Sequence, residues 1–216
     1  MLLILVTSHD DTRFRNMAPT QSHQVLELAR AKGAVRARDL VPLDIPRTVL
    51  SRLVAQGALI RTSRGVYVRA DANITEHHSL VEVAVRVPGA AINLLSALAF
   101  HGLTDELPVA VWIAVKRGNQ APRLDSPRIE VTWTAERFLR LGVTRHMIEG
   151  VDVAITNPAR TVADCFKYRS RVGVDVAVAA LRDYLKRHRT GRPELWNMAG
   201  ACRVQRVIRP YLEALS

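Results

Sequence analysis

The sequence predicts an α+β protein, in which an N-terminal winged helix-turn-helix is followed by a mixed α/β domain that ends in a helical bundle. Three observations predict this class. In the first third, apolar residues have helical spacing that Gly and Pro interrupt, and two short β-prone runs follow. The middle of the chain has Val-rich segments and segments in which apolar and polar residues alternate. From Pro158 onward, apolar residues recur at helical spacing. The 216 residues, 48% of them hydrophobic, suffice for a buried core.

The changes in pattern divide the chain into three parts. We expect residues 1–20 to form a loose extension, residues 21–72 a winged-helix DNA-binding domain, and residues 73–216 a mixed α/β domain. The apolar run over residues 2–6 is too short for a secretory signal, and no stretch approaches the ~20 apolar residues of a membrane span. The sequence therefore predicts a cytoplasmic protein with no membrane partner.

The three helices of the first domain are predicted from capping and turn residues. Ser22 can cap a first helix that Gly33 ends. A short second element stops at Pro42, and Asp44 can cap a third helix over residues 46–56. A short element followed directly by such a helix is the order of a helix-turn-helix.

The third helix is amphipathic, and its polar face is basic. Its apolar face is formed by Val49, Leu50, Leu53 and Val54. Its polar face is formed by Arg47, Thr48, Ser51 and Arg52. Because Arg can bind guanine through two hydrogen bonds and hydroxyl groups can bind phosphate, this face is typical of a helix that reads the major groove.

A short hairpin follows this helix and carries three further arginines. The β-prone runs over residues 58–62 and 66–69 are joined by Ser63-Arg64-Gly65, a three-residue connection that contains Gly. We expect Arg61, Arg64 and Arg69 on this wing to contact phosphates or the minor groove.

The net charge favours a polyanionic partner. The chain carries 31 Lys and Arg against 20 Asp and Glu, which gives +11. Residues 1–72 hold 11 basic and 6 acidic side chains, residues 73–159 hold 8 and 9, and residues 160–216 hold 12 and 5. The two ends of the chain are therefore basic and the middle is neutral, which suits double-stranded DNA as the partner.

The second domain is predicted to alternate helices and strands before its helical end. Residues 75–86 and 94–101 read as helices, residues 109–115 and 129–133 as strands, residues 135–141 as a short helix, residues 146–149 and 151–155 as a hairpin, and residues 158–168, 174–185, 193 onward and 204–215 as helices. We expect the apolar faces of the last helices to form core.

The search for catalytic chemistry finds few candidates. Phosphate-binding loops and the common hydrolase and kinase motifs are missing, so no cofactor and no metal site are predicted. His77 and His78 diverge on a helix and read as surface residues, and His101 reads as a cation at a helix C-terminus. Asp152 and Asp164 are separated by one strand-to-helix turn and could converge, although capping or ion pairing is the commoner role.

Three segments together resemble the AbiEi family of antitoxins from type IV toxin-antitoxin systems. They are RLVAQGALIRTSRGVYV over residues 52–68, NLLSALAFHGL over residues 93–103, and VDVAITNPARTVADCF over residues 151–166. The resemblance extends from about residue 22 to residue 168. It implies a winged helix that represses its own promoter at inverted repeats, with the recognition helix at 46–56, and a second domain that neutralises a cognate nucleotidyltransferase toxin.

In the second domain the resemblance covers Ser96-Ala97-Leu98 and Ala159-Arg160-Thr161 with Asp164. From its spacing alone, Arg160 can form a helix-surface ion pair with Asp164. Three functions stay open: a DNA-binding antitoxin, a stand-alone transcriptional regulator, and an atypical serine/threonine protein kinase that inactivates the toxin. Only the kinase would need ATP with Mg²⁺, and Asp152, Asp164 and Lys167 are its candidate groups.

Overall fold

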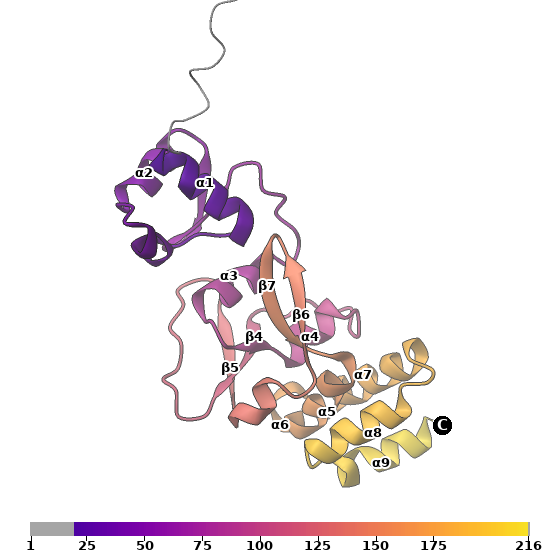
Figure 1. The fold of residues 1–216 in the computed structure, drawn as a ribbon. Helices are drawn as coiled ribbons and strands as arrows, with labels where there is room; N and C mark the ends of the chain where they lie inside the picture. Colours follow the sequence, from indigo (N-terminus) through magenta and orange to yellow (C-terminus); the bar gives the residue numbers. More distant parts are fainter. Residues whose placement is uncertain (1–19, 216) are drawn as a thin grey trace, which may run out of the picture.

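The computed structural model describes residues 20–215, so the predicted N-terminal extension lies outside the described residues except for Thr20. The winged helix lies at one end of the molecule, a mixed sheet lies in the middle, and a layer of helices lies at the other end (Figure 1). The predicted fold class is confirmed.

The N-terminal domain has the predicted order of helices and strands. Its elements are α1 (Gln21–Lys32), the 3-10 helix η1 (Ala37–Leu43), α2 (Thr48–Ala55), β1 (Leu59–Ser63) and β2 (Val66–Arg69). The strands β1 and β2 pair antiparallel, and Val35 adds a bridge to Tyr67 on the other edge of β2. The segment between α1 and η1 is thereby attached to the wing.

Two predicted caps are wrong. Thr20, not Ser22, caps α1, because its hydroxyl oxygen accepts from the backbone N–H of His23 at 3.3 Å. Asp44 adopts a left-handed backbone with φ 51° and closes η1, so that Arg47 directly precedes α2. The chain reverses direction at Asp44, and this turn separates the two helices of the helix-turn-helix.

The second domain is built on a five-stranded mixed sheet. Its strands are β3 (Ala91–Ile92), β4 (Val111–Lys116), β5 (Ile129–Thr134), β6 (Val143–Ile148) and β7 (Val151–Thr156), in the order β5-β4-β3-β7-β6. The central strand β3 was not predicted because it has only two residues, yet it pairs parallel to β7 and antiparallel to β4. The predicted hairpin is formed by β6 and β7.

Helices cover both faces of this sheet. They are α3 (His78–Arg86), α4 (Leu94–Phe100), α5 (Pro158–Lys167), α6 (Arg169–Val172), α7 (Val174–Arg187), α8 (Arg192–Ala201) and α9 (Gln205–Ala214). Along β4 the side chains alternate: Ile113 packs in the cluster that includes α3, whereas Trp112 packs with α4, α5 and the C-terminal helices. The helix predicted over 135–141 is only one 3-10 turn, η2 (Glu136–Leu139), because the left-handed Gly142 leads directly into β6.

The winged helix is joined to the sheet at the turn between β6 and β7. This turn consists of Glu149 and Gly150, both with positive φ, as in the type I′ turns of tight hairpins. The Glu149 carboxylate accepts from the backbone N–H of Thr75 at 2.6 Å and from its hydroxyl at 2.9 Å, and it lies 2.7 Å from Nδ1 of His78. Val66 and Val68 of the wing pack in the same cluster as α3 and the sheet.

Glu149 is charged under ordinary conditions. Burial pushes the pKa of its carboxyl upward, but the hydrogen bonds from His78 and Thr75 more than offset burial, so the pKa lies below its usual value. A carboxyl with a lowered pKa stabilises the fold above its unfolded-state pKa, and this contribution is lost as the pH falls through the folded-state pKa. The junction is therefore stabilised at neutral pH.

The winged helix approaches the β6–β7 turn closely at Gly33, where there is no room for a side chain. A Cβ atom at Gly33 would overlap the carbonyl oxygen of Glu149 and lie 2.7 Å from the carbonyl carbon of Gly150, whereas one at Gly57 would meet nothing within 4 Å. Both glycines have nearly the same φ, 70° and 69°.

We expect Gly57→Ala to lower the free energy of unfolding by ~1 to 2 kcal/mol, because alanine is strained in this left-handed backbone conformation. Gly33→Ala should lower it by a further ~1 to 3 kcal/mol, because its Cβ atom would also overlap the β6–β7 turn. Urea unfolding measures both losses. Equal losses would show that the two domains do not meet at this point.

Candidate nucleic-acid interface

The orientation of α2 is set by its buried apolar side. Val49, Leu50 and Leu53 are 4%, 1% and 2% exposed, and Val54 is half-buried. They pack in one cluster with Val25 and Ala29 of α1, Leu40 of η1 and Leu59 of β1. Any rotation of α2 about its axis would expose these side chains, so the opposite side of the helix is held toward solvent.

The opposite side of α2 is the predicted polar face. It is formed by four exposed residues, Arg47, Thr48, Ser51 and Arg52. Among the described residues, neither arginine lies within 4 Å of a carboxylate oxygen, and Arg52 donates from Nη2 to the hydroxyl of Ser22 at 3.0 Å. A hydrogen bond to an exposed hydroxyl group leaves the guanidinium charge uncompensated, so both arginines remain suited to an anionic partner.

The three wing arginines differ in their surroundings. Arg64 is 82% exposed and lies 3.9 Å from an equally exposed Asp125, and such a surface pair contributes little. Arg61 donates to the backbone oxygen of Ser63, within the wing itself. Arg69 donates to both oxygens of Asp71, at 2.8 and 2.6 Å, and these bonds hold the pKa of Asp71 below its usual value. Arg69 is therefore the wing arginine whose charge is compensated.

The comparison with protein families bears on this part of the chain. Residues 23–70, which span α1 to β2, match the family model described as transcriptional regulator, AbiEi antitoxin. The N-terminal domain is thus similar to AbiEi antitoxin transcriptional regulators. The matched segment contains all seven side chains predicted for DNA contact, and the resemblance seen in the sequence is confirmed for this domain.

The crystal structure of the RV2827C protein from Mycobacterium tuberculosis is similar, with a TM-score of 0.48 and 18% identity, over 86% of this chain and 77% of that chain. No curated protein matches the chain.

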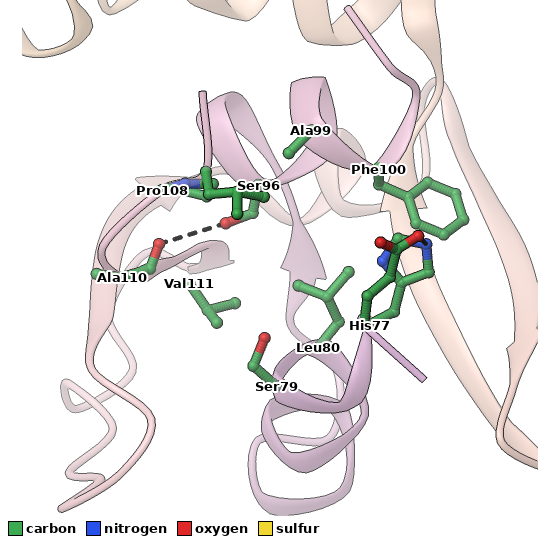
Figure 2. A pocket seen from close by; sticks show the side chains of 11 residues that line it. His77, Ser79, Leu80, Ser96, Ala99, Phe100, Pro108, Ala110 and Val111 are labelled. Carbon is green, nitrogen blue, oxygen red and sulfur yellow. Dashed lines mark hydrogen bonds and ion pairs between the residues drawn. The ribbon is translucent and has the colours of Figure 1, made fainter. Parts of the chain in front are cut away.

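Outside residues 23–70, a cavity of about 300 Å³ lies between α3 and α4, and His77, Ser79 and Ser96 are among the residues that line it (Figure 2). Ser96 has a structural role: its hydroxyl accepts from the backbone N–H of Trp112 at 2.9 Å and donates to the carbonyl oxygen of Ala110 at 3.4 Å. The remaining walls are mainly apolar, with Leu80 and Phe100 among them. No base contacts Ser96, and the cavity offers no activated nucleophile.

Two histidines differ from their predictions. His78 is not a free surface residue, because its ring contacts Glu149 at the domain junction and Glu82 at 3.6 Å. His101 stands at the C-terminal end of α4 as predicted, but burial lowers the pKa of its ring, and Nε2 contacts the carbonyl oxygen of Thr156 at 2.7 Å. Its role is thus a hydrogen bond between α4 and β7 rather than a helix-terminal charge.

Of the three candidate kinase residues, Asp164 and Lys167 share helix α5, whereas Asp152 has a separate place and partner. Asp152 lies on β7 with a half-exposed side chain and pairs with Arg145 at 3.2 Å. Asp164 is buried in α5 and pairs with Arg160 at 2.8 Å, and both of these side chains are only 3% exposed. The predicted ion pair between Arg160 and Asp164 therefore forms, but its predicted place on the helix surface is wrong. Tertiary packing buries it, since α5 lies between α4, α7 and α8.

The ion pair of Arg160 and Asp164 also forms hydrogen bonds to two neighbouring segments of the chain. Arg160 also donates to the carbonyl oxygen of Leu141 at 2.8 Å, which attaches the segment after η2 to α5. The thiol of Cys202 donates to Asp164 at 3.5 Å. Burial raises the pKa of Asp164, and the positive charges of Arg160 and Lys167 oppose this rise. The geometry is that of a structural network.

Residues 20–215 contain neither a metal-binding cluster nor a membrane-spanning helix. No group of three or more His, Cys, Asp or Glu side chains in this range is arranged to hold a metal ion. Within the same range no helix combines the length and apolarity needed to cross a bilayer.

The structural role of Asp164 can be tested by unfolding. We expect Asp164→Ala to lose ~3 to 5 kcal/mol of unfolding free energy, because it leaves the guanidinium of Arg160 buried without its partner. The double substitution Arg160→Met with Asp164→Leu removes both charges, and we expect it to lose less than the single one. Urea denaturation measures both. An Asp164→Ala protein as stable as the wild type would contradict the structural assignment and return Asp164 to the catalytic candidates.

Proposed function

We propose that the protein is a cytoplasmic antitoxin that represses its own promoter by inserting α2 into the major groove, and that its second domain neutralises a cognate nucleotidyltransferase toxin. The observation that carries this proposal is the polar face of α2, whose two arginines stand in solvent without a carboxylate partner among the described residues, inside a segment of the AbiEi antitoxin type.

The side chains divide into two groups by the contacts they can make. Arg47 and Arg52 have the length and the two-donor geometry to bind guanine O6 and N7. Thr48 and Ser51 are short and suit phosphate oxygens close to the helix. Arg64, which is 82% exposed in the turn of the wing, suits a phosphate beside the groove. In this arrangement Arg61 adds charge near the backbone, and Arg69 holds the end of the wing through Asp71.

The DNA partner is expected to contain inverted repeats. One winged helix covers about half of an operator, and two copies related by a twofold axis would read the two halves. The resemblance to AbiEi antitoxins supports the same expectation. Under this proposal the operator lies upstream of the gene itself.

Binding rather than catalysis is the mode of neutralisation that we favour. The kinase alternative needs ATP, Mg²⁺ and convergent acidic groups, whereas Asp152 and Asp164 have separate partners and separate surroundings. The proposed activity requires no cofactor. A stand-alone transcriptional regulator would bind DNA in the same way but would have no toxin to neutralise. The toxin-protection experiment below distinguishes it from an antitoxin.

The DNA contacts are tested by single substitutions with a matched control. We expect Arg47→Ala and Arg52→Ala each to weaken operator binding by ~1 to 3 kcal/mol and to relax sequence preference, because each removes a base contact. Arg64→Ala should weaken binding to all sequences and reduce the slope of log K against log salt by about one. Arg182→Ala on α7 removes the same charge from an exposed site in the C-terminal helical layer and serves as control. Fluorescence anisotropy at several salt concentrations measures each constant. Identical binding by all four variants and the wild type would refute the assignment of α2.

Neutralisation should be separable from repression. We expect a protein with both Arg47→Ala and Arg52→Ala to protect cells against the toxin encoded beside its gene as well as the wild type does, because toxin binding is assigned to the second domain. The same variant should fail to repress a reporter driven by its promoter. Growth and reporter activity are measured in the same strain. Loss of protection with normal protein levels would place the toxin contact on α2, and no effect of the wild type on any neighbouring gene product would favour the stand-alone regulator.

A further inference from the structure

A second basic site lies at the end of the molecule opposite α2. A cavity of about 500 Å³ opens where the end of β5 meets η2 and the junctions α5–α6 and α8–α9. In Figure 1 these elements lie beside α6, at the far side of the sheet from α1 and α2. A duplex seated on α2 would therefore not extend into this cavity, and the site needs an explanation of its own.

Five cationic side chains line the cavity: Arg117, Arg137, Lys167, Arg169 and Arg203. No Asp or Glu is among the lining residues. Over residues 20–215, none of the five lies within 4 Å of a carboxylate oxygen, although the neighbouring Arg171 pairs with Glu130 at 2.8 Å. Concentrated positive charge without counter-charges in a concave site raises the local potential and attracts anions.

The cations of this cavity differ from those of the neighbouring hollows in how many have acidic partners. The neighbouring cavity around Lys116 also contains Glu136, and these two side chains are 2.7 Å apart. Another, around Arg145, contains Asp152 at 3.2 Å. In those two hollows Lys116 and Arg145 each have an acidic partner, although Arg140, which lines both, has none within 4 Å among the described residues. Of the five cations of the 500 Å³ cavity, none has such a partner.

Aromatic rings complete the walls. Trp133 is 37% exposed at the end of β5, and Phe138 and Tyr168 line the cavity beside it. Lys167 lies 5.1 Å from the ring centre of Phe138 and 5.8 Å from that of Tyr168, so its position is fixed by two cation–π contacts. An exposed indole next to uncompensated arginines can stack on a base while the arginines bind phosphate.

The frame of the cavity is rigid. The buried pair of Arg160 and Asp164 attaches the segment after η2 to α5 and contacts Cys202 at the end of α8, so that it ties together three sides of the cavity. Arg203 holds a left-handed backbone, φ 61°, at the α8–α9 turn, a conformation that is strained for a residue with a side chain. This conformation closes α8, because the backbone N–H groups of Arg203 and Val204 donate to the carbonyl oxygens of Gly200 and Ala199.

We propose that this cavity binds a nucleoside polyphosphate, with its phosphate groups held by Lys167 and the surrounding arginines and its base stacked on Trp133. The volume is within the range of small-ligand sites and suits one nucleotide rather than a duplex. The phosphate groups belong either to a free nucleotide or to the triphosphate end of a strand. The proposal concerns binding alone and involves no transfer step.

The test is titration of the full-length protein with ATP, GTP, CTP and UTP, with inorganic triphosphate, and with a short single-stranded RNA that carries a 5′-triphosphate. Calorimetry gives the affinity, and quenching of tryptophan fluorescence reports on the base. We expect at least one nucleoside triphosphate to bind. Lys167→Ala and Arg203→Ala should each weaken that binding by about tenfold or more, since each removes a charged hydrogen-bond donor. Trp133→Ala should weaken nucleotide binding by about tenfold but leave inorganic triphosphate binding unchanged.

Two controls separate the loss of a specific nucleotide contact from a general loss of charge or of folding. Lys116→Ala removes one charge from the neighbouring, compensated cavity and should change the affinity by less than twofold. Unaltered melting temperature and operator binding show that each variant is folded. If the triphosphate-ended RNA competes with the nucleotide at equal or greater affinity, the strand end is the source of the phosphates and the site stands. No binding of any nucleotide at millimolar concentration, equal weakening by Lys116→Ala, or binding of inorganic triphosphate as tight as that of the nucleotides would overturn the proposal.

Discussion

The nucleic-acid interface depends on one packing constraint, the burial of Val49, Leu50 and Leu53 beneath α2. Each fully buried side chain of this size contributes about 1.5 to 3 kcal/mol, so turning the helix to hide its arginines would cost several kcal/mol. Burial of the apolar face therefore keeps the polar face of α2 in solvent, and no bound partner is needed to orient it. The AbiEi match over residues 23–70 coincides with the segment that this constraint organises.

The sheet connects two basic ends with different chemistry. At one end, Glu149 in the β6–β7 turn binds Thr75 and His78, and Gly33 of the winged helix lies directly against the backbone of the same turn. At the other end, the buried pair of Arg160 and Asp164 fixes η2 and α8 around a cationic cavity. An exposed helix face with a wing beside it suits a duplex, whereas a partly open hollow with an exposed indole suits a single nucleotide. The neutral middle third of the sequence corresponds to the sheet that separates them.

The sequence predicts those features that depend on local spacing. The outward face of α2, the hairpin after it and the order of the later helices all follow from periodicity and turn residues, and the structure has them. Features that need tertiary contacts were missed or misread. The ion pair of Arg160 and Asp164 has the spacing of a surface pair, and only the packing of α7 and α8 on α5 shows that it is buried. The five cations of the cavity come from separate segments. The basic excess over residues 160–216 pointed only toward Lys167, Arg169 and Arg203, since Arg117 and Arg137 lie in the neutral middle of the sequence.

The central claim is that α2 lies in the major groove, and methylation interference on the promoter tests it most directly. Guanine N7 faces the major groove and adenine N3 faces the minor groove, so partial methylation before binding reports which groove the protein needs. The account predicts that N7 methylation of guanines in two symmetric half-sites, about one helical turn apart, prevents binding. Interference from adenine N3 alone, or from no base at all, would contradict it.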